Sequence, residues 1–155
     1  KIMTYTMRPV SPIKVDIILA KPVSGNLPKA QNLDGQCDFT RATISGNKVT
    51  IYSGSHWRIE YSGGSHAANG NKFVKYQIYS VTDGDYIGLE GIGHGESYST
   101  KAKCCATALI LDSDISTSKE LEFRVVDATS NQARTSSAYA SFQYMPIKIF
   151  ELPVI

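Results

Sequence analysis

Three strand-like segments follow one another in the second half of the sequence, at residues 98–112, 121–126 and 138–145, with only polar breaks between them. Successive side chains of a strand point to opposite faces of a sheet, so each segment predicts two faces of different character. Small side chains on one face let a second sheet approach closely, which is typical of the inside of a two-sheet sandwich. In the first segment that face carries Ala102, Cys104, Ala106, Ala108 and Ile110.

Further alternating segments precede these three. Residues 56–61 alternate most cleanly: Trp57, Ile59 and Tyr61 are expected to face inward, and the polar residues between them outward. Nowhere do apolar residues keep helical spacing for ten residues with caps. The sequence therefore predicts an all-β fold, an antiparallel two-sheet sandwich of jelly-roll type with about 8–10 strands. The other predicted strands cover residues 14–19, 37–44, 48–52, 72–81 and 86–89.

Glycine, asparagine and aspartate mark the predicted turns. Asp83-Gly84 predicts a hairpin with a tight type I′ turn, because such a turn needs positive φ at its centre. Residues 22–35, residues 62–71 and the segment with Gly91, Gly93 and Gly95 are predicted to be loops. We expect one compact domain, with N-terminal strands and a linker or loop region at 1–35 and the sandwich at 36–155.

Charge and composition argue against several classes of function. The net charge of +2 comes without a basic cluster, so no nucleic-acid partner is expected. No run of 18 apolar residues occurs, so no membrane insertion is expected. The chain opens on Lys1, which suggests a fragment or a processed product.

The three cysteines are Cys37, Cys104 and Cys105. We expect reduced, mostly buried thiols, although one disulfide to Cys37 stays open as an alternative. The set lacks the spacing of a zinc site, and the three histidines lack that of a metal site, so no metal or other cofactor is expected. Pairs such as Asp112 and Asp114 suit calcium, but they suit turns better.

No catalytic signature is present. The sequence has no G-x-S-x-G elbow, and its glycine-rich segment lacks the lysine and helix of a phosphate loop, so we do not expect an enzyme. Sugar binding is harder to dismiss, since lectin-like sites combine an exposed aromatic face with polar groups on loops. The candidate ligand-binding residues are His56, Trp57, Arg58, His66, Asn69, His94 and Glu96.

The order of these signals resembles the jelly roll of the C1q and tumour-necrosis-factor type. A long strand leads through a glycine turn to a return strand, then come a small-residue strand ending near an acidic turn, an apolar strand at 121–126 and a last strand with spaced aromatics. The resemblance covers about two thirds of the chain, and similar domains form the heads of viral and phage fibres and spikes. It implies a homotrimer about a three-fold axis, with Tyr139, Phe142 and Tyr144 at or near that axis.

The segment 147–155 is the most interaction-prone part of the sequence, because its apolar residues are poorly suited to water. Ile147, Ile149 and Phe150 are therefore further candidates for a subunit interface. The alternative is an ordinary edge strand packed on its own subunit.

Our first hypothesis is a non-enzymatic, homotrimeric attachment or spike-head domain on a virion surface. It would bind a host cell-surface glycan or protein through exposed loops. The alternatives are a secreted pilin or fimbrial subunit assembled by strand exchange on a bacterial surface, which would use the tail as a donated strand, and a carbohydrate-binding module.

Overall fold

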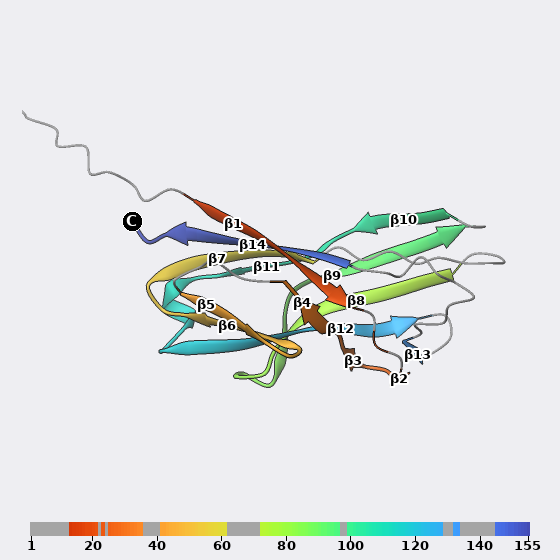
Figure 1. Cartoon of the computed structure of the whole chain (residues 1–155), viewed down its shortest axis with the longest axis horizontal. Coiled ribbons are helices and arrows are strands. Elements are labelled where there is room, and N and C mark those ends of the chain that lie inside the picture. The colour runs from red at the N-terminus through yellow and green to blue at the C-terminus, as the bar shows by residue number, and fades with distance from the viewer. Residues whose placement is uncertain are drawn as a thin grey trace, which may run out of the picture.

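The computed structural model describes residues 13–21, 23, 25–35, 41–61, 72–96, 99–128, 132–133 and 145–155. These residues contain strands and one short 3-10 turn, η1 (Asp112–Asp114), and no α-helix (Figure 1). The all-β prediction is confirmed. The strands are β1 (Lys14–Lys21), β2 (Gly25–Asn26), β3 (Lys29–Ala30), β4 (Asn32–Asp34), β5 (Ala42–Ser45), β6 (Lys48–Tyr52), β7 (Ser55–Tyr61), β8 (Lys72–Ser80), β9 (Asp85–Glu96), β10 (Ser99–Cys104), β11 (Ala106–Ile110), β12 (Ser118–Ala128), β13 (Gln132–Ala133) and β14 (Met145–Pro153).

The strands form two antiparallel layers, named here after a central strand of each. The β14 sheet has the order β4-β1-β14-β7-β11, and the β12 sheet has the order β9-β8-β12-β6-β5, with β10 added to β9 and β3 to β12. Strands far apart in sequence are neighbours, since β1 pairs with β14 and β6 with β12. This is the jelly-roll sandwich that the sequence predicts.

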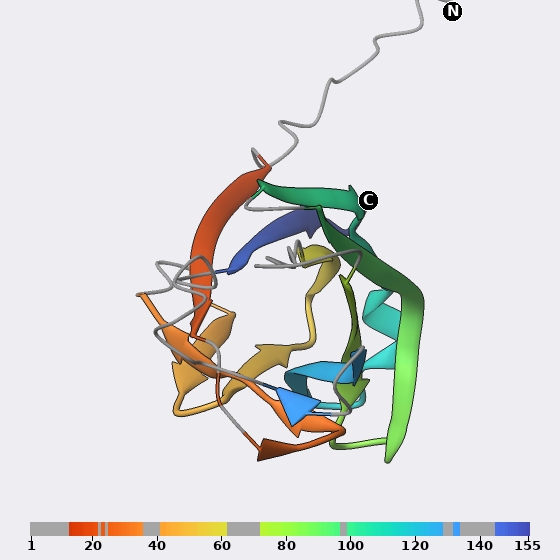
Figure 2. The ribbon, with the colours of Figure 1, turned by 90° about the vertical axis from the view of Figure 1, so that its right-hand side faces the viewer.

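The two layers meet at both edges, so the strands surround the core as a ring (Figure 2). On one side β9 belongs to the β12 sheet but also pairs with β11, where Leu89 lies opposite Thr107. On the other side the backbone N–H of Leu33 in β4 donates to the carbonyl of Gly46, in the turn between β5 and β6, at 3.0 Å. Joined edges leave fewer unpaired backbone groups to attract other strands.

Side chains from both layers fill the core. The predicted inward face of β7 is confirmed, because Trp57, Ile59 and Tyr61 are fully buried. Tyr61 packs edge-on against Tyr76 of β8 and Phe123 of β12, with ring centroids 5.0 and 5.4 Å away. Burial raises the pKa of the Tyr61 hydroxyl far above its usual value, so the ring stays neutral.

The predicted strand 98–112 is divided into β10 and β11. Its small-residue face is confirmed in β11, where Ala106, Ala108 and Ile110 are buried. Cys105 lies at the break and is exposed, so the expectation of buried thiols is wrong for this residue. Cys37 and the side chain of Cys104 lie outside the described part of the chain.

The hairpin at Asp83-Gly84 is present, between β8 and β9, but its turn is not the predicted two-residue type I′ turn. Four residues, 81–84, connect the strands, and the N–H of Gly84, at φ +73°, donates to the carbonyl of Ser80 at 2.9 Å. The Ser80 hydroxyl donates to the Asp83 carboxylate at 2.7 Å, and Lys119 of β12 pairs with the same oxygen at 2.6 Å. These bonds fix Asp83 inside a longer loop.

The segment with Gly91, Gly93 and Gly95 was predicted to be a loop, and this prediction is wrong: all three lie in β9. Two glycines of β9, Gly88 and Gly91, lie where neighbouring strands come too close for a side chain. A Cβ on Gly91 would lie 2.3 Å from the Tyr76 ring, and a Cβ on Gly88 would lie 1.9 Å from the carbonyl oxygen of Thr107. Glycine in a strand here marks the close approach of β9 to β8 and β11.

The predicted loop 22–35 is held against the sandwich in its described part. Gln31 is fully buried there. Its side-chain oxygen accepts from the N–H of Val23, and its side-chain nitrogen donates to the carbonyl of Lys29, both at 2.9 Å. Its backbone N–H donates to the carbonyl of Phe123 in β12 at 2.9 Å. Burying an amide is favourable only with such partners.

Gly88→Ala and Gly46→Ala are expected to differ in stability although both glycines have positive φ, +71° and +62°. Each alanine should lose about 1–2 kcal/mol for the left-handed backbone. Only Gly88→Ala adds the collision with Thr107, since a Cβ on Gly46 meets nothing within 4 Å. The extra loss should be about 1–3 kcal/mol in the free energy of unfolding, measured with urea. Equal losses would contradict the close approach of β9 to β11.

Asp83→Asn is expected to lower the free energy of unfolding at pH 7 and to have a smaller effect on it in acid. The hydrogen bond from Lys119, then that from Ser80, lowers the pKa of Asp83. A carboxylate with a lowered folded pKa adds stability above its unfolded pKa of about 3.9, and this contribution disappears as the pH falls through the folded value. The urea midpoints of wild type and Asp83→Asn should therefore converge below about pH 4. Asp85→Asn, in the same hairpin, is the control.

Candidate oligomerisation surface

The outer face of the β14 sheet carries exposed apolar side chains near both of its edges. On β1, Ile18 and Ala20 point into the core, so Val15, Ile17 and Leu19 point outward and are 48, 57 and 37% exposed. These three residues are called the β1 strip. Monomeric proteins rarely expose contiguous apolar rows of this kind. Large contiguous apolar patches generally mark contact sites.

A second apolar group lies at the other edge of this face. It consists of Leu109 of β11, Leu111 just after it and Leu89 of β9, which are 63, 43 and 70% exposed. These three residues are called the edge strip. Leu89 is held at the corner of the sandwich by the pairing of β9 with β11.

The strand registers place Val15 and Ile17 of the β1 strip at the same levels along the strands as Leu109 and Leu89 of the edge strip. One row crosses the sheet as Val15, Phe150, Arg58 and Leu109, and the next as Ile17, Lys148, Glu60 and Thr107, which leads to Leu89. Three strand spacings of about 4.8 Å separate β1 from β11, so the strips lie about 14 Å apart.

The centre of this face is charged only in part. Arg58 pairs with Glu60 on the same strand. The Arg58 guanidinium also lies 5.2 Å from the centre of the Phe150 ring, so the aromatic side chain is half-buried beneath a cation. Lys148 is exposed between them and the β1 strip. The face is therefore apolar at both edges with a narrow polar centre.

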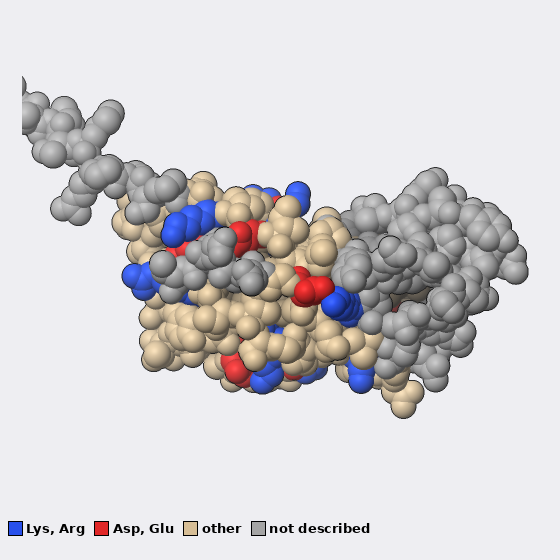
Figure 3. Space-filling model, viewed as in Figure 1, with Lys and Arg blue, Asp and Glu red and all other residues tan. Residues whose placement is uncertain are grey.

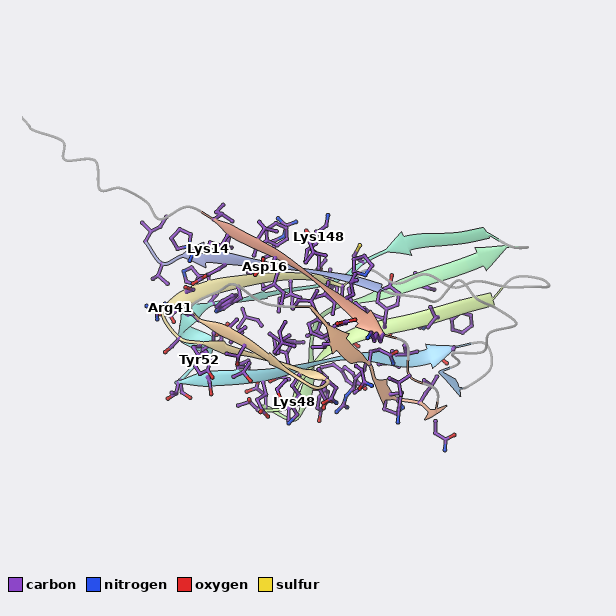
Figure 4. All side chains as sticks on the ribbon, viewed as in Figure 1. Lys14, Asp16, Arg41, Lys48, Tyr52 and Lys148 are labelled. Atoms are coloured by element: carbon purple, nitrogen blue, oxygen red, sulfur yellow. The ribbon has the colours of Figure 1, made fainter. Side chains whose placement is uncertain are left out.

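The outer face of the β12 sheet is different, because its charged groups are paired with one another. Arg124 donates to Glu122 at 2.7 and 2.9 Å and stacks 3.4 Å from the centre of the Tyr79 ring. Lys48 pairs with Glu120 at 3.0 Å. The outer face of the β12 sheet therefore presents charges that are already paired within the subunit. Lys14 and Lys148 lie on the upper side of the sandwich and Lys48 on the lower side (Figure 4).

The space-filling view shows scattered charges of both signs and no large patch of one sign on the described surface that faces the viewer (Figure 3). Among the described residues, no three His, Cys, Asp or Glu side chains come together as a possible metal site. Within the same ranges, no helix is long and apolar enough to cross a membrane.

Of the predicted ligand-binding residues, the structure describes the side chains of His56, Trp57 and Arg58, and Trp57 does not share a face of β7 with the other two. Trp57 is fully buried, and its indole N–H donates to the carbonyl of Tyr52 at 3.4 Å, so its assignment as an exposed ligand contact is wrong. Arg58 is exposed on the opposite face of β7, and His56 accepts a bond at Nδ1 from the N–H of Asp112 at 2.9 Å. His94 and Glu96 lie in β9 with side chains outside the described part; His66 and Asn69 also lie outside it.

Two of the predicted interface residues must also be corrected. Ile147 and Ile149 are fully buried in the core, so they are not available at a surface of the folded subunit. Phe150 has the opposite strand parity and lies on the outer face. β14 is not an edge strand, because it pairs with β1 on one side and β7 on the other. Tyr139, Phe142 and Tyr144 lie outside the described residues.

Sequence reasoning missed the β1 strip and the edge strip. A signal existed in the apolar runs Ile17-Ile18-Leu19-Ala20 and Ala108-Leu109-Ile110-Leu111, in which both faces of a strand are apolar. Runs of this kind are typical of strands that are covered on both sides.

Comparison with known proteins supports the fold and goes no further. No family model matches the sequence, and no curated protein matches it. Among solved structures, a crystal structure of murine APRIL at pH 8.0 matches with a TM-score of 0.50 and 8% identity, over 90% of this chain and all of that one. Murine APRIL is a jelly-roll protein of the tumour-necrosis-factor family. The chain therefore has a jelly roll similar to that of tumour-necrosis-factor-like proteins, as the resemblance predicted.

Trp57→Ala and Arg58→Ala are expected to have very different effects although the residues are neighbours. Loss of the buried indole should cost about 3–5 kcal/mol in the free energy of unfolding. Loss of the exposed guanidinium should cost about 1 kcal/mol or less. Guanidinium chloride unfolding, followed by far-ultraviolet circular dichroism at one protein concentration, measures both. A stable Trp57→Ala protein would contradict the assigned parity of β7.

Proposed function

We propose that this chain is the head domain of a non-enzymatic, homotrimeric attachment protein. The observation that supports this is the apolar outer face of the β14 sheet, with the β1 strip and the edge strip at its two sides. In this proposal, a second copy of the same chain binds this outer face.

The arrangement of the two strips favours a ring. The two strips are different from each other. A contact between the edge strip of one copy and the β1 strip of the next is therefore a head-to-tail contact. A contact of this kind closes into a ring when the rotation between copies permits it. Jelly rolls of the tumour-necrosis-factor type form trimers, and the similarity of fold favours three copies here.

Assembly through this face leaves the ends of the sandwich for binding. β8, β9 and β10 reach beyond the body of the sandwich at one end (Figure 1), and the predicted ligand residues His94 and Glu96 lie in β9 there. Binding residues are commonly carried at such ends by a rigid scaffold. We propose a host cell-surface glycan or protein as the ligand and a virus or phage particle as the setting, with three weak sites acting together by avidity.

The alternative of strand exchange gains no support from the tail. A donated strand is one that its own subunit does not use, whereas β14 is paired on both sides within this chain. No observation of the site favours a carbohydrate-binding module over the trimeric head.

Ile17→Asp is expected to dissociate the trimer, since it places a charge in the centre of the β1 strip. Sedimentation velocity at micromolar concentration should show a trimer for wild type and a monomer for Ile17→Asp. Thr43→Asp is the matched control, an exposed position of β5 in the other sheet, and should remain trimeric. A monomeric wild type, or a trimeric Ile17→Asp, would rule out this face as the interface.

Cys105 lies directly before β11. Its exposed thiol gives an independent measure of whether this edge of the sheet is covered in the assembly. Its alkylation by iodoacetamide, followed by peptide mass spectrometry, should be slower in the wild-type assembly than in Ile17→Asp. Equal rates would place the contact elsewhere.

A further inference from the structure

Lys148 stands out on the proposed interface. It is exposed on the outer face of β14, with Ile17 opposite it on β1 and Glu60 opposite it on β7. Within the described ranges the structure gives Lys148 no ion-pair partner. An apolar neighbour that covered this ammonium group would remove its water without replacing it, which is costly for a charge.

The nearest acid within the subunit is already engaged. Glu60 pairs with Arg58, which also lies over Phe150. The three charged groups in the centre of the face therefore sum to +1. A partner that complements this centre must bring a negative charge to the level of Lys148.

An acid beside the edge strip lies at the right level. The row of Ile17 and Lys148 ends at Leu89, and the next residue of β9 is Glu90, whose side chain is 44% exposed. Within its own subunit Glu90 pairs with Lys75 at 3.5 Å. In a ring whose axis runs along the strands, rotation keeps each row at its own height, so Leu89 and Glu90 of one copy meet Ile17 and Lys148 of the next.

The other acids near the edge strip are less suitable. Asp112 accepts the N–H of Gly54 at 2.5 Å, and Asp114 accepts the N–H of Leu111 at 3.1 Å. Both hold the turn after β11, and they lie beyond the row of Leu109, farther along the strands from Lys148.

We propose that Lys148 of one copy pairs with Glu90 of the next, and that this pair selects the register in which the copies assemble. The inference rests on the proposed trimer. Leu89 on Ile17 supplies apolar burial at the same level, while the charge pair disfavours copies that are shifted by one row, in which Lys148 would face a leucine.

A charge exchange tests the pair. Lys148→Glu and Glu90→Lys should each raise the dissociation constant of the oligomer by about tenfold or more, and the double variant should return it to within about threefold of wild type. Lys48→Glu makes the same charge change on the β12 sheet and should leave the constant unchanged. Analytical ultracentrifugation gives the constants, and far-ultraviolet circular dichroism shows that each variant is folded.

The outcomes separate this inference from the proposed function. A monomeric wild type would remove the trimer itself. A trimeric wild type with an unaffected Lys148→Glu, or a double variant no better than the singles, would overturn the charge pair and leave the trimer in place. If a charge reversal prevents folding, Lys148→Met and Glu90→Gln replace it, and both should make assembly less sensitive to salt than in wild type. Unchanged salt dependence would again overturn the pair.

Discussion

The packing of Tyr61 against Tyr76 and Phe123 is the contact on which the rest of the structure depends. Tyr61 comes from the β14 sheet and its two partners from the β12 sheet, and all three rings are fully buried. These rings set the distance between the two layers. At this distance β9 passes so close to Tyr76 that a Cβ on Gly91 would collide with its ring, so glycine is required there. β9 can then pair with β8 and reach β11 at Leu89. The corner that carries the edge strip is thus a consequence of the core.

With the layers fixed, alternation decides what each outer face presents. On the β12 sheet, Glu122, Arg124, Lys48 and Glu120 satisfy one another, and Tyr79 is covered by a guanidinium. On the β14 sheet the outward positions are mostly apolar. Both sheets contribute side chains to the same core, so the core alone does not account for the difference. It is best explained by a second layer over the β14 sheet alone, and this is why the proposed function is an assembly.

The class of fold is predictable from the sequence because alternation is a local pattern. The spacing of Trp57, Ile59 and Tyr61 indicates a buried face even when the strands that pack against it are not known. The sequence could not predict that Gly91, Gly93 and Gly95 belong to a strand, since glycine is read as a turn unless the approach of Tyr76 is known. The apolar character of the tail is visible in the sequence, but hydrophobicity alone does not separate Ile147 and Ile149, which point into the core, from Phe150, which points outward. Whether β14 is central or at an edge depends on β1, more than a hundred residues away, and no local pattern contains that information.

The two strips share a cause that is visible in the chain itself. Ile17-Ile18-Leu19-Ala20 in β1 and Ala108-Leu109-Ile110-Leu111 at the end of β11 are apolar on both faces, whereas β7 alternates strictly between Trp57, Ile59 and Tyr61 and the polar residues that separate them. One face of each run fills the core of the subunit. The apolar side chains of the other face are exposed on the subunit, and exposed leucine and isoleucine favour aggregation unless they are covered. The central strands of the same sheet keep Arg58, Glu60 and Lys148 outward, with Phe150 beneath Arg58, so the exposed apolar residues lie at the margins. Such a surface is apolar at the two strips, where neighbouring copies would meet, and charged in the centre between the strips. This combination is suited to a contact of defined register.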